Sequence, residues 1–348
     1  MQTSPHDAMQ IAKPRLKLTS ILSFLMLCFC FSNANANPKD IYQFSDYPTS
    51  RTLKHPEWFK QSFLNLQEDL AEAKSMGKIG VVIYFGQNNC AYCEKLLKHD
   101  FGRQDIADYT QKYFDVVYVD IWGKIEITTV DGKKITERAF ADTEKVHFTP
   151  TLLFYNLKGE KIFQLRGYYP PYQFRAALDY VVGEYYQIET FKSYVNRAVP
   201  GLGFEAGELN EHDIFNNASL NLNQKRHRPL AVFFEQARCH ACDILHGDPL
   251  YSPEILQQLE KMDAVQLNLW AKTPIITPQG ETTTAKAWAD QLNIFYTPSI
   301  LFFDENGNEI IRIDSTVQLY RLSKILRYVL TGAYKQHPNY QRWHAQDQ

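Results

Sequence analysis

The chain repeats itself once, at an offset of about 148 residues. "FTPTLLF", which starts at Phe148, matches "YTPSILF" from Tyr296, and "DIWGK" from Asp120 matches "NLWAK" from Asn268. Solenoid proteins repeat about every 20–50 residues and need several neighbouring repeats to bury a core, so this repeat does not indicate one. Two copies within 348 residues instead predict two tandem domains, each with a core of its own.

Strands and helices are expected to alternate in the same order in both copies. An apolar strand, at 80–85 in the first copy and 230–234 in the second, runs directly into a helix. Each copy closes with two strands joined at a glycine, Gly159 or Gly307, and a last amphipathic helix. This alternation with a closing hairpin predicts an α/β fold in which a mixed sheet is flanked by helices.

The segments outside the repeat set the expected domain boundaries. "PEWFKQSFLNLQEDLAEAK", before the first copy, is predicted to be one helix of an N-terminal extension. The stretch around "VPGLGFEAGELNEHD" is predicted to be a linker. The expected order is a signal peptide at 1–36, a first domain with its helical extension at 37–190, a linker at 191–225, a second domain at 226–335 and a C-terminal tail at 336–348.

The first 36 residues have the pattern of a secretory signal peptide. Lys13, Arg15 and Lys17 precede an apolar run at 18–31, and small residues at Ala34 and Ala36 follow it. The run is too short to span a bilayer, which takes about 20 residues. We therefore expect cleavage after Ala36, loss of Cys28 and Cys30 with the signal, and no stable membrane span afterwards; a lipid anchor is the alternative.

Charge and cysteine content exclude several classes of protein. The formal charge of −2 gives no broad basic surface for nucleic acid. The cysteines that remain after signal removal form two CxxC pairs, Cys90 with Cys93 and Cys239 with Cys242. That count excludes a disulfide-rich scaffold.

A CxxC pair that opens a helix after a strand has a definite redox chemistry. Residues i and i+3 share one helix face, so the two sulfurs can bond to each other. The free N–H groups and the dipole at the helix N-terminus stabilise a thiolate at the first cysteine and lower its pKa. We therefore expect the first cysteine of each pair to attack a disulfide and the second to resolve the mixed disulfide.

CxxC pairs also occur in zinc sites and as structural disulfides. Zinc ribbons place their pairs about 15–20 residues apart, whereas a whole domain separates these two, so the spacing argues against a metal site. A structural staple is the second alternative. Each pair closes a loop too short to restrict the unfolded chain by much, so a staple would stabilise the domain little.

The motifs resemble those of the thioredoxin superfamily. "CAYCEKLL", "VDIWG", "FTPTLLF" and "RGYYPPYQFRAALDYV" look more narrowly like SoxW-like periplasmic thioredoxins, closely over 78–185 and more loosely over 228–332. The resemblance implies two tandem thioredoxin-fold domains in the periplasm. It also implies that Cys90 and Cys239 are nucleophiles, that Cys93 and Cys242 resolve, that Pro150 and Pro298 are cis-prolines facing them, and that Thr149 and Thr297 pair with an extended client.

The chain departs from the family pattern beside the cysteines. Thioredoxin has a buried carboxylate six residues before the nucleophile, where this chain has Tyr84 and Phe233. Glu235, four residues before Cys239, is interpreted as a solvated carboxylate at a strand end; the alternative is that it substitutes for the missing buried carboxylate. His99 and His246 are interpreted as part of the wet face of the helix after each CxxC. Trp122 and Trp270 are expected to be core or sheet-edge aromatics, with a substrate-lining role as the alternative, and Tyr168 and Tyr169 either pack at the surface or form a peptide platform.

Together these features predict an exported thiol–disulfide oxidoreductase that acts on protein thiols and disulfides without a metal or organic cofactor. A reductase or isomerase is favoured over an oxidase, and a reductase would need electrons from a donor in the inner membrane. The alternative from a different class is a non-enzymatic tandem module that binds peptides or acts as a chaperone through its cis-proline surface.

Overall fold

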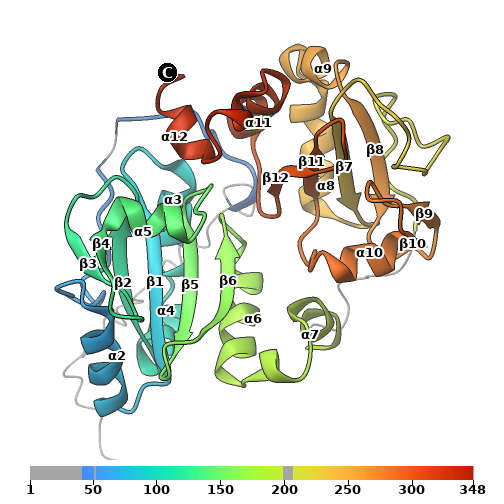
Figure 1. The fold of residues 1–348 in the computed structure, drawn as a ribbon. Helices are drawn as coiled ribbons and strands as arrows, with labels where there is room; N and C mark the ends of the chain where they lie inside the picture. The colour runs from blue at the N-terminus through green and yellow to red at the C-terminus, as the bar shows by residue number, and fades with distance from the viewer. Residues whose placement is uncertain (1–40, 51, 199–206, 348) are drawn as a thin grey trace, which may run out of the picture. The chain divides into compact units, whose positions relative to one another are not determined.

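The computed structural model describes residues 41–50, 52–198 and 207–347 (Figure 1). The predicted signal peptide, with Cys28, Cys30 and the cleavage site at Ala36, lies outside the described residues. No helix in the described ranges is long and apolar enough to span a bilayer.

The first domain is built on a four-stranded mixed sheet in the order β2-β1-β5-β6. β1 runs parallel to β2 and antiparallel to β5, and β5 and β6 form the closing hairpin. The elements of this domain, in chain order, are α2 (Leu66–Ser75), β1 (Gly80–Gly86), α3 (Ala91–Lys95), the π-helix η1 (Leu96–Asp100), α4 (Gln104–Tyr113), β2 (Phe114–Asp120), β3 (Glu126–Thr128), β4 (Lys134–Thr136), α5 (Glu137–Thr143), β5 (Thr151–Asn156), β6 (Lys161–Arg166), α6 (Pro171–Val182), η2 (Tyr185–Gln187) and α7 (Phe191–Ala198).

The second domain repeats this plan, with the sheet order β12-β11-β7-β8. β7 takes the place of β1, parallel to β8 and antiparallel to β11. Its elements are β7 (Leu230–Glu235), α8 (His240–Gly247), η3 (Pro249–Tyr251), α9 (Pro253–Leu259), β8 (Asp263–Asn268), β9 (Pro274–Ile276), β10 (Thr282–Thr284), α10 (Ala285–Gln291), β11 (Ser299–Phe303), β12 (Glu309–Ile313), α11 (Leu319–Leu330), η4 (Ala333–Lys335) and α12 (Tyr340–His344). The predicted duplication of a mixed α/β sheet is confirmed.

Each sheet separates two apolar cores, one on each face. Every residue of the central strands β1 and β7 is buried. Val82 and Tyr84 face one core of the first domain, and Val81, Ile83 and Phe85 face the other. A central strand covered on both faces needs apolar residues at successive positions, which is why "VVIYF" and "LAVFF" are continuous apolar runs and do not alternate.

The helix predicted over "PEWFKQSFLNLQEDLAEAK" is shorter than expected. Only α2 is helical, because Leu64 has a φ of 61° and the Asn65 side chain accepts a hydrogen bond from the N–H of Glu68 as an N-cap. Before it, Phe59 is buried in the core, and the N–H of Lys60 donates to the carbonyl of Val116 in β2. Tertiary packing of the aromatic part of this segment therefore prevails over its helical pattern.

Two short helices lie outside the domain boundaries that were expected from the sequence. α7 lies where a linker was expected, and α12 lies in the expected C-terminal tail. α12 carries an N-cap signal in the sequence, because the Asn339 side chain accepts from the N–H groups of Gln341 and Arg342. Both helices follow the last long helix of a copy, so they are equivalent in the repeat and belong to the domains.

The two domains contact each other through positions that are equivalent in the repeat. Phe148 of the first domain packs in the core of the second, and Tyr296 of the second packs in the core of the first. Arg166 forms an ion pair with Asp314 at 3.4 Å, and these two residues are a second pair of equivalent positions. Such reciprocity is typical of the isologous interface of a symmetric dimer, here formed within one chain.

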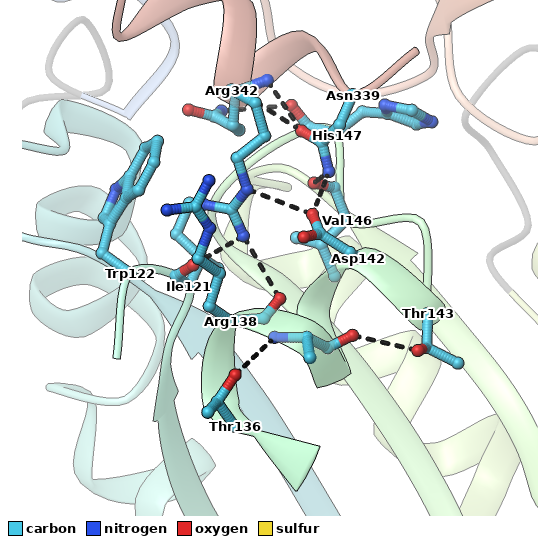
Figure 2. A network of polar contacts seen from close by, with 12 residues as sticks. Ile121, Trp122, Thr136, Arg138, Asp142, Thr143, Val146, His147, Asn339 and Arg342 are labelled. Carbon is cyan, nitrogen blue, oxygen red and sulfur yellow. Dashed lines mark hydrogen bonds and ion pairs between the residues drawn. The ribbon is translucent and has the colours of Figure 1, made fainter. Parts of the chain in front are cut away.

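α7 and α12, the last helix of each copy and here called the terminal helices, also make reciprocal contacts between the domains. Figure 2 shows Arg342 of α12 bonded to Asp142 of α5, with 3.1 Å between Nε and Oδ1, and donating from Nη2 to the carbonyl of Ile121 at 2.8 Å. The guanidinium also lies 4.4 Å from the centre of the Trp122 ring. Asn339 at the start of α12 adds a hydrogen bond to Asp142 at 2.9 Å.

The equivalent contact in the other direction uses a lysine. Lys192 of α7 places its ammonium 2.6 Å from Asp290 of α10 and 4.7 Å from the centre of the Trp270 ring. Asp290 and Trp270 are the repeat equivalents of Asp142 and Trp122. Each terminal helix is thus held by an aspartate and a tryptophan of the other domain.

Candidate redox site

The first cysteine of each CxxC is the N-cap of a helix. Cys90 ends the turn after β1 and its Sγ accepts from the N–H of Cys93 at 3.0 Å; Cys239 does the same with Cys242, also at 3.0 Å. Sulfur in this position receives a backbone hydrogen bond and lies at the positive end of the helix dipole. When the pair is reduced, both effects stabilise a thiolate at Cys90 and Cys239.

Each pair is joined by a disulfide, Cys90 to Cys93 and Cys239 to Cys242, with Cα–Cα distances of 5.2 and 5.1 Å. The partners differ in accessibility. Cys90 and Cys239 are both 7% exposed, whereas Cys93 is fully buried and Cys242 is 1% exposed. An incoming disulfide can therefore meet the first sulfur of each pair but not the second.

The predicted proline loops lie against these sulfurs. The Thr149–Pro150 and Thr297–Pro298 peptide bonds are both cis. Cys90 Sγ lies 3.3 Å from Thr149 Oγ1 and 3.6 Å from its carbonyl oxygen, and Cys239 Sγ lies 3.4 and 3.6 Å from the same atoms of Thr297. The structure thus brings the predicted site residues together as two groups of four, one in each domain.

One tryptophan and one glutamine complete each group, and the glutamine was not predicted from the sequence. Trp122 Nε1 donates to Gln87 Oε1 at 2.6 Å, and Gln87 Nε2 donates to Thr149 Oγ1 at 2.8 Å. Trp270 Nε1 donates to Gln236 at 3.0 Å in the same way. The signal for these glutamines was present in the sequence, because each stands three residues before its CxxC in both copies.

Glu235 is not the solvated carboxylate expected from the sequence. Its residue is fully buried, and its carboxylate lies 2.9 Å from His246 Nε2 and accepts from Gln266 Nε2 at 3.1 Å. The segment before β7 packs on both of these partners, because the carbonyl of Asn210 accepts a hydrogen bond from Gln266 and the Phe215 ring lies 5.9 Å from that of His246. His246 and His99, expected on a wet helix face, are buried as well, at 6% and 5% exposure.

The two centres consequently differ in their buried polar groups. Gly86 occupies the position of Glu235 in the first domain, where a Cβ would come within 2.7 Å of the Tyr84 hydroxyl. Burial raises the pKa of Tyr84 well above its ordinary value. Burial also raises the pKa of Asp100, at the end of η1, well above its ordinary value. The carboxylate of Glu235 therefore has no equivalent at the same strand position of the first domain.

Tyr168 and Tyr169 serve neither of the roles expected for them. Tyr168 is fully buried and Tyr169 is 2% exposed, and the Tyr169 hydroxyl donates to the carbonyl of Asp314 at 2.9 Å. The N–H of Thr316 donates to the carbonyl of Tyr168 at 3.1 Å. These tyrosines are part of the contact between the domains and are not a surface for peptide.

A cavity of about 420 Å³ opens onto Cys90. Gln87, Trp122 and Thr149 line it from the first domain, and Tyr320, Arg321 and Tyr340 line it from the second. Within the described ranges, no group of three or more histidine, cysteine, aspartate or glutamate side chains is placed to hold a metal ion.

Comparison with known proteins places this arrangement in a family. A sequence model described as a thioredoxin-like domain matches the chain twice, at residues 66–182 and 217–330, and so covers more than half of it. The second match begins inside the segment expected to be linker. No curated protein sequence matches the chain significantly.

Solved structures match one domain at a time. A thioredoxin-fold protein from Helicobacter pylori is 26% identical, with 35% of this chain and 84% of that chain covered and a TM-score of 0.31. A thioredoxin from Thermus thermophilus is 25% identical, with 34% and 84% covered and a TM-score of 0.27. The C-terminal domain of DsbD from Neisseria meningitidis is 16% identical, with 29% and 81% covered and a TM-score of 0.24.

Proposed function

The chain belongs to the thioredoxin-like domain family, and on that basis we propose that it is a thiol–disulfide oxidoreductase that acts on protein disulfides through both CxxC centres. The observation that carries the proposal is that Cys90 and Cys239 are each a helix N-cap, each the more exposed sulfur of a disulfide, and each in contact with a cis-proline loop. A structural staple needs none of these features.

The reduced centre would react in two steps. The thiolate of Cys90 attacks one sulfur of the client disulfide, whose S–S bond breaks as a mixed disulfide forms and the other client sulfur leaves as a thiolate; this thiolate gains a proton as the Cys93 thiol loses one. Cys93 then attacks Sγ of Cys90, which releases the second client thiol and forms the Cys90–Cys93 disulfide. Two electrons pass from the pair to the client, and the reverse sequence oxidises a client dithiol.

The proposal extends to export and direction. The signal-peptide pattern of residues 1–36 and the resemblance of "CAYCEKLL" to SoxW-like periplasmic thioredoxins support a place in the periplasm. There the chain would work as a reductase or isomerase. It would receive electrons from a donor in the inner membrane, because the compartment itself is kept oxidising.

Reduction of insulin by dithiothreitol, followed by turbidity, tests the function. The mature wild-type chain should accelerate the reaction, and a Cys90→Ser, Cys239→Ser double variant should not. Equal rates for the two proteins would reject the enzyme and favour a peptide-binding or chaperone module, which does not need the thiols.

A further inference from the structure

The second domain forms one wall of the Cys90 site, and a single side chain dominates it. Arg321, in the first turn of α11, donates from Nη2 to the carbonyl of Thr149 at 3.0 Å. That carbonyl lies next to the cis-proline and 3.6 Å from Cys90 Sγ. Arg321 is 8% exposed and Thr149 is 1% exposed, so this hydrogen bond is well shielded from water.

The second domain is tied directly to the CAYC motif at this point. The N-cap of α11, Gln318, makes no capping bond with its own side chain. Asp46, from the segment before the first domain, accepts instead from the N–H groups of Tyr320 and Arg321 at 3.0 and 2.8 Å. The hydroxyl of Tyr92, inside the CAYC motif, donates to Asp46 at 2.7 Å and accepts from the N–H of Gln318 at 2.9 Å.

Stacking fixes the orientation of the guanidinium. Cζ of Arg321 lies 3.3 Å from the centre of the Tyr92 ring, a close cation–π contact between two buried groups. A planar guanidinium held by an aromatic face and a carbonyl has lost its rotamer freedom already. The hydrogen bond to Thr149 is therefore preorganised and costs little further entropy.

The CHAC centre has no such neighbour. The repeat places Gln173 of α6 where α11 has Arg321. Among the described residues, only Cys239 is within hydrogen-bonding reach of the Thr297 carbonyl. Within the described ranges, the Thr297 carbonyl therefore has no donor equivalent to Arg321, whereas the Thr149 carbonyl accepts from Arg321.

We propose that Arg321 sets the specificity of the Cys90 centre by occupying the Thr149 carbonyl, so that the docked centre reacts faster with low-molecular-mass disulfides than with extended polypeptide. A client strand that pairs with this edge must first displace the guanidinium. A small disulfide needs only the cavity of about 420 Å³ and no backbone pairing. The proposal rests on the proposed function. Its reaction is the exchange written above, with a small disulfide reduced to two thiols as the cysteine pair is oxidised.

Single-turnover kinetics of the full mature chain test this. In a Cys239→Ser, Cys242→Ser background only the CAYC pair reacts, and the reduced protein is mixed with insulin or with bis(2-hydroxyethyl) disulfide. The readout is the ratio of the insulin rate constant to the small-disulfide rate constant. Loss of a cation beside Cys90 changes thiolate reactivity toward both disulfides, so the ratio isolates the effect on access.

Arg321→Ala should raise this ratio at least fivefold, and Asp46→Asn, which weakens the anchor of α11 but keeps the arginine, should shift it in the same direction. Arg327→Ala, on the exposed side of the same helix, is the matched control, and it should leave the ratio within twofold. Arg321→Ala in a Cys90→Ser, Cys93→Ser background, where only CHAC reacts, should also leave it unchanged.

The failures are distinguishable. If the reduced CAYC pair reacts with neither disulfide, the proposed function itself fails. If both react and neither Arg321→Ala nor Asp46→Asn moves the ratio, Arg321 does not set the specificity. If Arg321→Ala does not fold, the ratio of rate constants measured for Asp46→Asn decides whether Arg321 sets the specificity.

Discussion

Exposure decides which thiol of each pair can attack a client. Cys90 and Cys239 reach the surface, while Cys93 and Cys242 lie in the core beneath them. The resolving thiols can act only on the neighbouring sulfur, so their loss should stop the reaction halfway. This assignment of roles can be tested by trapping.

Cys93→Ser should accumulate mixed disulfides between Cys90 and client proteins, because attack survives and resolution fails. Cys90→Ser should trap nothing through the first centre. Thiol-blocked extracts run on non-reducing gels, with peptide mapping of the trapped bond, give the measurement in a Cys239→Ser, Cys242→Ser background. Bonds formed through Cys93 in place of Cys90 would reverse the assigned roles.

His240 distinguishes the second centre from the first at the residue scale. It follows Cys239 directly, is exposed, and has its ring 5.1 Å from that of Tyr42, while the equivalent position in the first centre is Ala91. An imidazolium beside a thiolate stabilises the reduced form of the pair and makes the disulfide more oxidising. For a two-electron couple about 1.4 kcal/mol corresponds to about 30 mV.

We therefore expect CHAC to be the more oxidising centre by tens of millivolts, and His240→Ala to remove much of the difference. Glutathione-equilibrium titration of the full chain, with the other pair changed to serine, measures each potential. An equal or lower potential for CHAC, or no response to His240→Ala, would contradict this.

At the scale of elements, α12 carries a half-buried histidine, His344. His344 lies 3.1 Å from the Tyr320 hydroxyl and lines the Cys90 cavity. Burial, with help from the nearby charges of Lys324 and Arg321, lowers the pKa of His344 to about 4, against the opposing effect of Asp347. The folded state thus holds this imidazole neutral where the unfolded chain would already be protonated.

Between pH 6.5 and 4 the unfolded state binds more protons at His344, so its contribution to stability is lost as the pH falls through this window. One proton corresponds to a slope of about 1.4 kcal/mol per pH unit, an upper limit because the side chain is partly exposed. His344→Gln should flatten the fall of the unfolding free energy, measured by urea titration at a series of pH values. His227→Gln, at an exposed histidine, is the control, and equal slopes for His344→Gln and wild type would refute the prediction.

The sequence predicted elements well where a local pattern agrees with burial. The strands at 80–85 and 230–234, the CxxC helices and both proline loops are where the patterns placed them, because apolar runs, spacing and turn residues are local signals. Glu235 was misjudged because its burial depends on the segment before β7, which shares no pattern with it. Arg321 was not identified because its partner, Thr149, belongs to the other domain.

The whole molecule is held by contacts that only the pairing of two copies creates. Arg342 and Lys192 reach across from α12 and α7, and both are more buried than the aspartates they bind, with side-chain exposures of 11% and 5%. Burial lowers the pKa of Lys192, so its ammonium relies on Asp290 and on the Trp270 ring to stay charged. The sequence pattern of one copy cannot predict these contacts, because each of them joins residues of two different domains.

Arg342→Ala and Lys192→Ala should each loosen the contact between the domains, at a cost of about 1–3 kcal/mol, because each removes a cation that binds an aspartate and covers a tryptophan ring of the other domain. The two sites act on one equilibrium, docked to undocked, so the double variant should sum both effects and unfold in two calorimetric transitions where wild type shows one. Small-angle scattering should show a larger radius of gyration for the double variant.

Arg103→Ala, which removes an exposed ion pair within the first domain, controls for loss of a surface charge and should change neither measurement. A single transition and an unchanged radius in the double variant would mean that the tyrosine and proline-loop contacts hold the domains together without the two terminal helices.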